Sequence, residues 1–195
     1  MVKHNKKIIL SFDDGPHPVW TEQLLHLLEN YSVKAIFFPA GKKVKKYPQI
    51  VKKIIRNNHL IGNHTWSHRL LFSANQKVLE KEVWEYHQYV KETFNYSMRF
   101  FRPPWGILNR KAVKIIEEQF GYQIIKWNID SLDYILPYSR KLQHVVLSTT
   151  TIDPIIILFH DGIILSPVLT RKYSLRTIEK LLQLKNKGIR FILPE

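Results

Sequence analysis

The chain has 195 residues, a length that suits one domain with a substantial core better than two domains. It contains no cysteine, which excludes disulfides, thiolate metal sites and a cysteine nucleophile. Its 30 Lys and Arg residues exceed its 16 Asp and Glu residues, and the formal net charge of +14 favours anionic partners without identifying one.

Strand-like and helix-like patterns alternate along the chain. Short apolar and β-branched runs predict strands, and apolar residues spaced three and four apart predict helices. Pro48 suits a first helical turn, and Asn75, Asn109 and Ser174 are suitable N-caps. In chain order the predicted elements are a strand at 7–10, a helix at 21–31, a strand at 34–38, a helix at 48–57, a strand at 60–62, a helix at 75–94, a strand at 98–101, a helix at 109–120, a strand at 122–129, a helix at 140–147, a strand at 155–159, a helix from 174 to just before 188, and a strand at 189–193.

This alternation predicts an α/β fold of about seven parallel strands, with residues 1–195 forming a single domain. The pattern alone does not distinguish a closed barrel from an open, doubly wound sheet. No apolar run approaches the ~20 residues of a membrane span. The run near the N-terminus is shorter than the roughly 7–15 residues of a secretory h-region. We therefore expect no transmembrane segment and no signal peptide, and we also expect a monomer.

Polar clusters follow five of the predicted strands. Each cluster taken alone is most often a turn, a rigid corner or a buried histidine. The carboxyl ends of parallel strands lie on one face of the sheet, however, and that face carries the chemistry of such folds. Five clusters at equivalent positions therefore predict one site. The clusters are Asp13 with Asp14, His64 with His68, Arg102, Asp130 with Asp133, and His160 with Asp161.

The residue types in these clusters suit metal-assisted hydrolysis of an acyl group. Two imidazoles and one carboxylate make a three-ligand site for a divalent ion, so His64 and His68 would bind it with one of the two adjacent aspartates. The other aspartate would act as general base, oriented by Arg102. His160 is the candidate general acid, and a carboxylate such as Asp130 would keep it protonated. No Gly-x-Ser-x-Gly motif for an acyl-enzyme is present.

Five motifs in this order resemble those of the polysaccharide deacetylase family, also called the NodB-homology domain. They are Ser-Phe-Asp-Asp-Gly-Pro, His-Thr-Trp-Ser-His, Arg-Pro-Pro-Trp-Gly, Asp-Ser-Leu-Asp-Tyr and Leu-Phe-His-Asp, and the similarity covers residues 7–193. The resemblance implies a distorted (β/α) barrel and a divalent ion, often Zn²⁺, with Co²⁺ as an alternative. It also implies removal of N-acetyl groups from N-acetylglucosamine polymers such as peptidoglycan or chitin, or of O-acetyl groups from xylan, in the cell envelope or outside the cell.

The resemblance further implies a role for each motif residue. It makes Asp13 the base, Arg102 its orienting partner, and His160 the acid, tuned by Asp130 in preference to Asp133. It makes Asp14, His64 and His68 the metal ligands. For the substrate it implies a backbone N–H near Trp105 that stabilises the oxyanion, and Leu158 beside the acetyl methyl group. Tyr134 stands where the family usually has Trp, which alters a groove wall without removing a catalytic group.

Two other classes of protein are compatible with parts of this pattern. A non-catalytic carbohydrate-binding module would use Trp66, Trp105 and Tyr134 as stacking surfaces. A nucleic-acid-binding protein would use the positive charge, but no recognition motif accompanies that charge and a Lys-rich solvated surface explains it equally well. We therefore expect no specific binding of nucleic acid.

Overall fold

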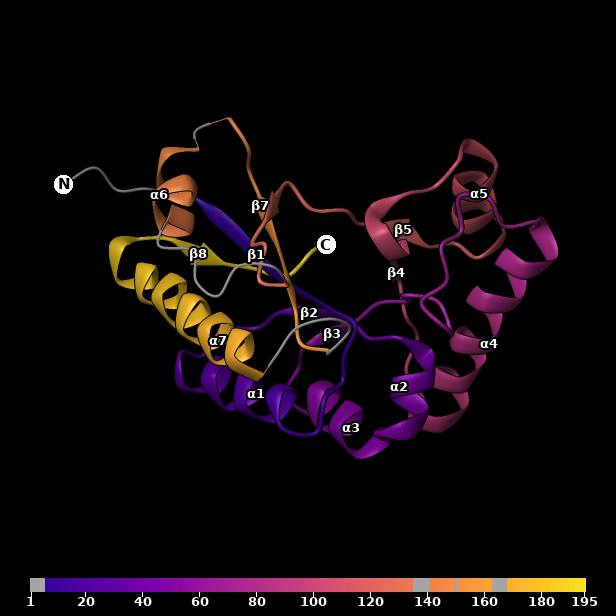
Figure 1. The fold of residues 1–195 in the computed structure, drawn as a ribbon, viewed down its shortest axis with the longest axis horizontal. Coiled ribbons are helices and arrows are strands. Elements are labelled where there is room, and N and C mark those ends of the chain that lie inside the picture. The colour runs from indigo at the N-terminus through magenta and orange to yellow at the C-terminus, as the bar shows by residue number, and fades with distance from the viewer. Residues whose placement is uncertain (1–5, 135–140, 150, 163–167) are drawn as a thin grey trace.

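Strand β1 (Lys7–Asp13) lies at the centre of a parallel sheet in the computed structural model, which describes residues 6–134, 141–149, 151–162 and 168–195 (Figure 1). The other strands are β2 (Ile36–Phe38), β3 (Leu60–Ile61), β4 (Phe100–Phe101), β5 (Gln123–Ile124), β6 (Ile129–Asp130), β7 (Ile155–His160) and β8 (Arg190–Phe191). The α-helices are α1 (Trp20–Asn30), α2 (Gly41–Lys46), α3 (Pro48–Arg56), α4 (Gln76–Phe94), α5 (Arg110–Lys114), α6 (Lys141–Ser148) and α7 (Val168–Leu182).

The strands form a curved, incompletely closed barrel. Their order is β3-β2-β1-β7-β6, and β8 pairs with the first residues of β1. Strands β4 and β5 form a separate parallel pair, which a bridge between Asn63 and Phe101 joins to the end of β3. Every strand pair is parallel. The predicted α/β class, the parallel sheet and the distorted barrel are therefore confirmed.

Successive side chains of β1 point to opposite faces of the sheet and so pack into two different hydrophobic cores. Ile8, Leu10 and Phe12 belong to the large core between the sheet and the helices (Figure 1). Ile9 lies on the opposite face, in a small cluster inside the barrel with Ile36, Phe38, Phe100 and Ile125. With a period of two residues, Ser11 and Asp13 continue this inner face above Ile9. The carboxyl end of β1 therefore points polar groups into the mouth of the barrel.

Several local predictions are confirmed. Asn75 caps α4 by accepting a hydrogen bond from the N–H of Val78, and Asn109 caps α5 by accepting one from the N–H of Ala112. Pro48 is the first residue of α3. After α5 the chain continues in a π-helical turn, Ile115–Gln119, within the predicted helix.

Two local predictions are wrong, and one helix is missing from the predicted elements. Residues 122–129 do not form one strand, because Gln123–Ile124 pairs with β4 whereas Ile129–Asp130 pairs with β7 in the other sheet. Ser174 does not cap a helix but lies within α7, and its hydroxyl donates to Asp133 Oδ2. The list of predicted elements lacks helix α2, because its six residues bury only one large apolar side chain, Val44, although the spacing of the lysines at 42–46 is typical of the outer face of a helix. The first residue of the helix predicted at 140–147 lies outside the described residues.

No helix in the described part of the chain combines the length and apolar character needed to cross a membrane.

Candidate active site

The two adjacent aspartates at the end of β1 point in different directions. Asp13 still belongs to the strand, and its Oδ1 accepts a hydrogen bond of 2.8 Å from Arg102 Nη1. Asp14 has left the strand with a positive φ of 69°, and its carboxylate lies against His64 and His68 instead. Both carboxylates are almost fully buried. The change of backbone direction at Asp14 therefore gives neighbouring residues separate partners.

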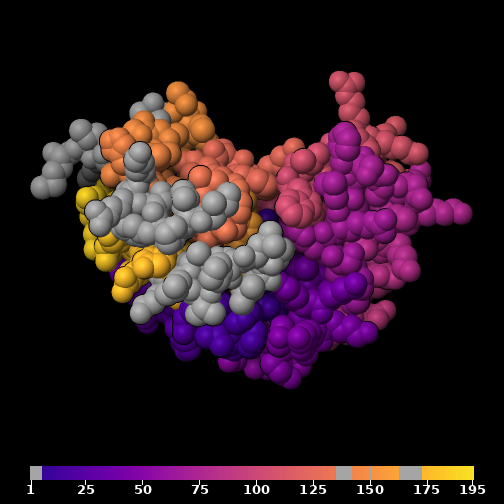
Figure 2. Space-filling model, viewed as in Figure 1, coloured from indigo at the N-terminus to yellow at the C-terminus, as the bar shows by residue number. Residues whose placement is uncertain are grey.

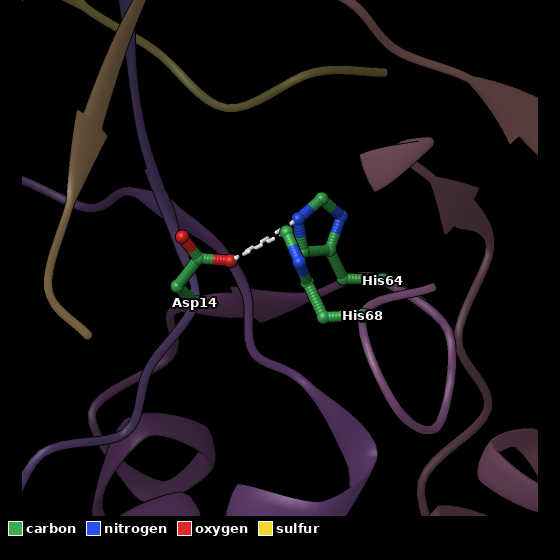
Figure 3. Close-up of side chains that lie close together, drawn as sticks. All are labelled: Asp14, His64 and His68. Carbon is green, nitrogen blue, oxygen red and sulfur yellow. Dashed lines mark ion pairs between the residues drawn. The ribbon is translucent and has the colours of Figure 1, made fainter. Parts of the chain in front are cut away.

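Asp14, His64 and His68 form a compact set of possible metal ligands (Figure 3). Asp14 Oδ1 lies 3.5 Å from His64 Nε2 and 2.9 Å from His68 Nε2. One ligand atom from each residue falls within 4.8 Å of the others. Two imidazole nitrogens and one carboxylate oxygen suit Zn²⁺ or a similar divalent ion, and they leave coordination positions for water and substrate.

The surroundings of this trio also favour a cation between the three side chains. His64 Nδ1 lies 2.7 Å from the carbonyl oxygen of Arg102, to which it donates, so the neutral ring presents a lone pair at Nε2. Asp14 Oδ1 is buried and faces Nε2 of both His64 and His68. A lone pair and a carboxylate oxygen facing each other repel unless a positive charge lies between them. The trio therefore fits a divalent metal.

The pKa values of His64 and Asp14 shift in opposite directions, and each shift favours the charged form of its group. Burial alone would lower the pKa of His64, but the carboxylates of Asp13 and Asp14 outweigh burial and raise it. Burial alone would raise the pKa of Asp14, but contacts with His64 and His68 lower it. The pocket thus stabilises a carboxylate and a positive charge next to each other.

The loop that carries the two histidines is held by hydrogen bonds that the sequence patterns did not reveal. Asn63 Oδ1 accepts from the N–H of Thr65, and Asn63 Nδ2 donates to the carbonyl of Val83 in α4. Glu82 accepts from the N–H and the hydroxyl of Ser67. These bonds hold the loop although both Thr65 and His68 have positive φ. Asn63 lies beside His64, but no spacing in the sequence links Glu82 to the site.

Arg102 is fully buried at the mouth of the barrel, and four acceptors surround its guanidinium group. Nη1 donates to Asp13 Oδ1 and to Ser11 Oγ, each at 2.8 Å. Nε donates to the carbonyl of Ile125, and Nη2 donates to that of Lys126. A buried charge persists only when it is paired and hydrogen-bonded in this way. Ser11 is thus a part of the site that motif reasoning missed.

Aromatic rings flank the same guanidinium. Its central carbon lies 4.3 Å from the ring centroid of Phe38 and 5.6 Å from that of Trp127. Burial lowers the pKa of Arg102 while Asp13 opposes the change, and a guanidinium remains charged at neutral pH. Arg102 therefore holds the Asp13 carboxylate in a fixed orientation.

His160 pairs with Asp133 and not with Asp130, which corrects the expectation from the sequence. His160 Nδ1 lies 2.8 Å from Asp133 Oδ1, and its backbone N–H donates to Asp133 Oδ2. Asp130 instead accepts from the N–H of Leu132 and the hydroxyl of Tyr134. The reason is the turn after β6, where Leu132 has a φ of 56° and the chain returns Asp133 to the end of β7.

The contact with Asp133 changes the proton affinity of His160. Burial alone would lower the pKa of His160, but the hydrogen bond and charge of Asp133 raise it to about 9. The imidazole is therefore protonated at neutral pH, with Nδ1 bound to Asp133. Asp161, the other member of this cluster, accepts a hydrogen bond of 2.6 Å from the hydroxyl of Thr21.

Exposed aromatic and apolar side chains border the site on two sides. Trp105 is 59% exposed, and its ring centroid lies 5.6 Å from that of His68. Tyr134 is 39% exposed and packs edge-on against His160. Figure 2 shows the surface hollowed between the parts of the chain near residues 105 and 130. Leu158, which the sequence placed beside the acetyl methyl group, is almost fully buried between Ser11 of β1 and Asp130 of β6.

Comparisons with known proteins agree with this geometry. The family model described as polysaccharide deacetylase matches residues 2–125. A peptidoglycan-N-acetylglucosamine deacetylase of Bacillus cereus is 34% identical over 200 residues, covering 98% of this chain and 88% of the relative. A chitooligosaccharide deacetylase of Sinorhizobium fredii is 31% identical, covering 80% of this chain and 72% of the relative. The crystal structure of the Bc1960 peptidoglycan N-acetylglucosamine deacetylase is 30% identical and superposes with a TM-score of 0.84, covering 97% of this chain and 86% of that one.

Proposed function

The chain belongs to the polysaccharide deacetylase family, and we propose that it removes N-acetyl groups from N-acetylglucosamine units of a polysaccharide, peptidoglycan or a chitin-like oligosaccharide, with release of acetate. The observation that carries this proposal is that one trio and two pairs of polar side chains lie together at one mouth of the barrel. Asp14 lies with the two histidines, Asp13 with Arg102, and His160 with Asp133. Amide hydrolysis needs a group that polarises the carbonyl, a general base for the water and a general acid for the leaving amine. The trio, the Asp13 pair and the His160 pair would supply these in that order.

Family members are metal-dependent, and in this chain Asp14, His64 and His68 would hold the ion. We propose Zn²⁺, because imidazole and carboxylate ligands with open positions suit it, and Co²⁺ would occupy the same ligands. When bound, such an ion polarises the acetyl carbonyl and lowers the pKa of a water molecule.

Asp13 is proposed as the general base that accepts a proton from the attacking water. Its Oδ1 is occupied by Arg102, which leaves Oδ2, 3.7 Å from His64 Nε2, directed toward the trio. A base must lie within reach of the proton it removes, and Arg102 fixes Asp13 in that position. Asp13 is therefore beside the point where the water would lie.

His160 is proposed as the general acid. Because Asp133 raises the pKa of His160 to about 9, the ring holds a proton at neutral pH. It would deliver this proton to the sugar nitrogen as the carbon–nitrogen bond breaks, so that the amine leaves neutral and acetate is the second product.

The substrate would lie in the hollow between Trp105 and Tyr134. Aromatic rings at the two walls suit the apolar faces of sugar rings, and Leu158 below them suits the methyl group of the acetyl. A backbone N–H near Trp105 is the proposed donor to the oxyanion. The chain would perform this reaction as one domain.

The test measures acetate released from peptidoglycan fragments, chitin oligosaccharides and acetylated xylan. We expect release from the N-acetylglucosamine substrates that stops in chelator and returns with Zn²⁺ or Co²⁺. The Asp13→Asn variant should retain metal and lose at least ~100-fold in kcat, the usual contribution of a general base. Release from xylan alone would assign the chain to ester hydrolysis, and wild-type rates in Asp13→Asn would refute the base assignment.

A further inference from the structure

The positive charge of the chain is concentrated in one quarter of its length. Residues 30–79 contain ten of the 30 Lys and Arg residues and none of the 16 Asp and Glu residues. This segment therefore carries +10 of the net +14, and the other three quarters carry only +4. It contains β2, α2, α3, β3 and the loop with the two histidines. The excess charge thus belongs to the part of the fold that forms one side of the site.

Helix α2 in this segment lies directly against the loops that carry the metal ligands. The backbone N–H groups of Gly41 and Lys42 donate to the carbonyls of Thr65 and Trp66, at 3.0 and 2.8 Å. Lys43 Nζ donates to the carbonyl oxygen of Asp14 at 2.7 Å. The helix also contacts α3 and α4, between which it lies (Figure 1). These contacts hold the backbone of α2 against the loops of the site.

Four exposed cations, Lys42, Lys45, Lys46 and Arg69, form what we call the basic patch. The three lysines are on α2, and Arg69 directly follows His68. Within the described ranges of the chain, none of the four forms an ion pair with a carboxylate. Lys53 of α3, in contrast, pairs with Glu22 at 2.7 Å. The charge of the patch is therefore not neutralised internally and extends about 8 Å into solvent at physiological salt.

We propose that the basic patch attracts the carboxylates of an acidic polysaccharide, so that the enzyme prefers N-acetylglucosamine in a polymer with free carboxylates, such as peptidoglycan, over neutral oligosaccharides. This inference rests on the proposed function and selects among its substrates. A cationic surface beside a site raises the local concentration of an anionic substrate and its rate of encounter. Ammonium groups act as flexible point charges, which suits carboxylates repeated along a chain rather than one fixed group.

The test compares kcat/KM for three substrates. They are soluble peptidoglycan fragments with free stem-peptide carboxylates, the same fragments after amidation of those carboxylates, and a neutral N-acetylglucosamine pentamer. The patch variant is Lys42→Gln with Lys45→Gln and Lys46→Gln. The matched control variant, Lys91→Gln with Lys111→Gln and Lys187→Gln, removes the same charge from exposed positions on α4, on α5 and after α7.

In wild-type protein at low salt we expect the carboxylate fragments to be preferred over the amidated ones. The patch variant should lower this ratio about tenfold, within the range of electrostatic steering, and the control variant by less than about twofold. In about 0.5 M salt the difference between wild type and patch variant should disappear, because the Debye length shortens to a few ångströms.

Other results of this test would overturn the proposal for the basic patch, and some would also overturn the proposed function. A ratio that the patch variant leaves unchanged, or that the control variant lowers equally, overturns the proposal while acetate release from the pentamer still supports the proposed function. Acetate release from none of the substrates overturns both. Binding of duplex DNA that the patch variant loses, with an unchanged substrate ratio, assigns the patch to nucleic acid and also overturns the proposal.

Discussion

Replacing Asp133 by Asn should shift the pH range over which the enzyme is active more than it lowers the maximum kcat/KM. Against the opposing effect of burial, Asp133 and, to a smaller extent, Asp13 and Asp14 raise the pKa of His160 from an ordinary 6.5 to about 9, a net stabilisation of the protonated ring of about 3 kcal/mol. At pH 8 a group with a pKa near 9 is about 90% protonated, whereas a group near 6.5 is about 3% protonated. The variant should therefore lose up to about 30-fold in kcat/KM at pH 8 through protonation alone, the full loss corresponding to a pKa of 6.5. At pH 6 both proteins hold the proton and the loss from this cause should be less than twofold.

The assay is the pH profile of kcat/KM for acetate release between pH 5 and 10. We expect the basic limb of the profile, where activity falls as pH rises, to lie near 9 in wild-type protein and to move toward 6.5 in Asp133→Asn, because Asp133 opposes burial more strongly than Asp13 and Asp14 do. Asp130→Asn is the matched control, since Asp130 binds Leu132 and Tyr134 and is not among the carboxylates that shift the pKa of His160. A basic limb that stays near 9 in Asp133→Asn, or that moves in Asp130→Asn instead, would refute the reasoning.

The contact between His160 and Asp133 should also make the free energy of unfolding depend on pH. Because the pKa of His160 is raised on folding, its contribution is complete below pH 6.5 and is lost as pH rises through 9. Thermal unfolding should accordingly show that the advantage of wild-type protein over Asp133→Asn shrinks between pH 6.5 and 9. An advantage that grows over this range would mean that the sign of the linkage is wrong.

Two further predictions concern the metal trio and the buried arginine. His64→Ala should lose both bound metal and activity, and metal content measured by elemental analysis at the wild-type level would remove His64 from the ligand set. Ser11→Ala should lower the free energy of unfolding by about 1–3 kcal/mol, because Arg102 Nη1 loses a buried acceptor. Ser11→Thr restores the hydroxyl and should recover most of this loss in a denaturant titration, whereas equal losses in both variants would mean that packing and not the hydrogen bond is responsible.

The sequence predicts the position of the site well because position depends on topology. Asp13, Arg102 and His160 each follow a short apolar run, and in parallel folds the ends of such runs meet at one face. The same logic fails for Asp133, because the distinction from Asp130 depends on the backbone conformation of Leu132 in the intervening turn. A spacing of three residues fits either choice. Only the path of the chain after β6 decides which carboxylate reaches His160.

The errors in the secondary-structure prediction have a similar cause. Residues 122–129 are apolar enough for one long strand, but Arg102 takes the carbonyls of Ile125 and Lys126 as acceptors. In one continuous strand those carbonyls would accept hydrogen bonds from a neighbouring strand. Because the buried guanidinium needs them as acceptors instead, the chain leaves the sheet between β5 and β6. Helix α2 escaped prediction for the opposite reason. It is held by backbone bonds to residues 65 and 66 and not by an apolar stripe of its own.

Strand β1 links the stability of the barrel to the chemistry at its mouth. Along its inner face Ile9 is apolar, Ser11 supplies a hydroxyl and Asp13 supplies a carboxylate, and the last two both bind Arg102. Since this guanidinium is fully buried, removing its charged partner altogether would cost about 3–5 kcal/mol. Asp13 is therefore the charge that permits Arg102 to be buried as well as the proposed base. The Asn substitution keeps an oxygen acceptor in place for Arg102, which is why Asp13→Asn separates the loss of the base from the loss of the fold better than Asp13→Ala would.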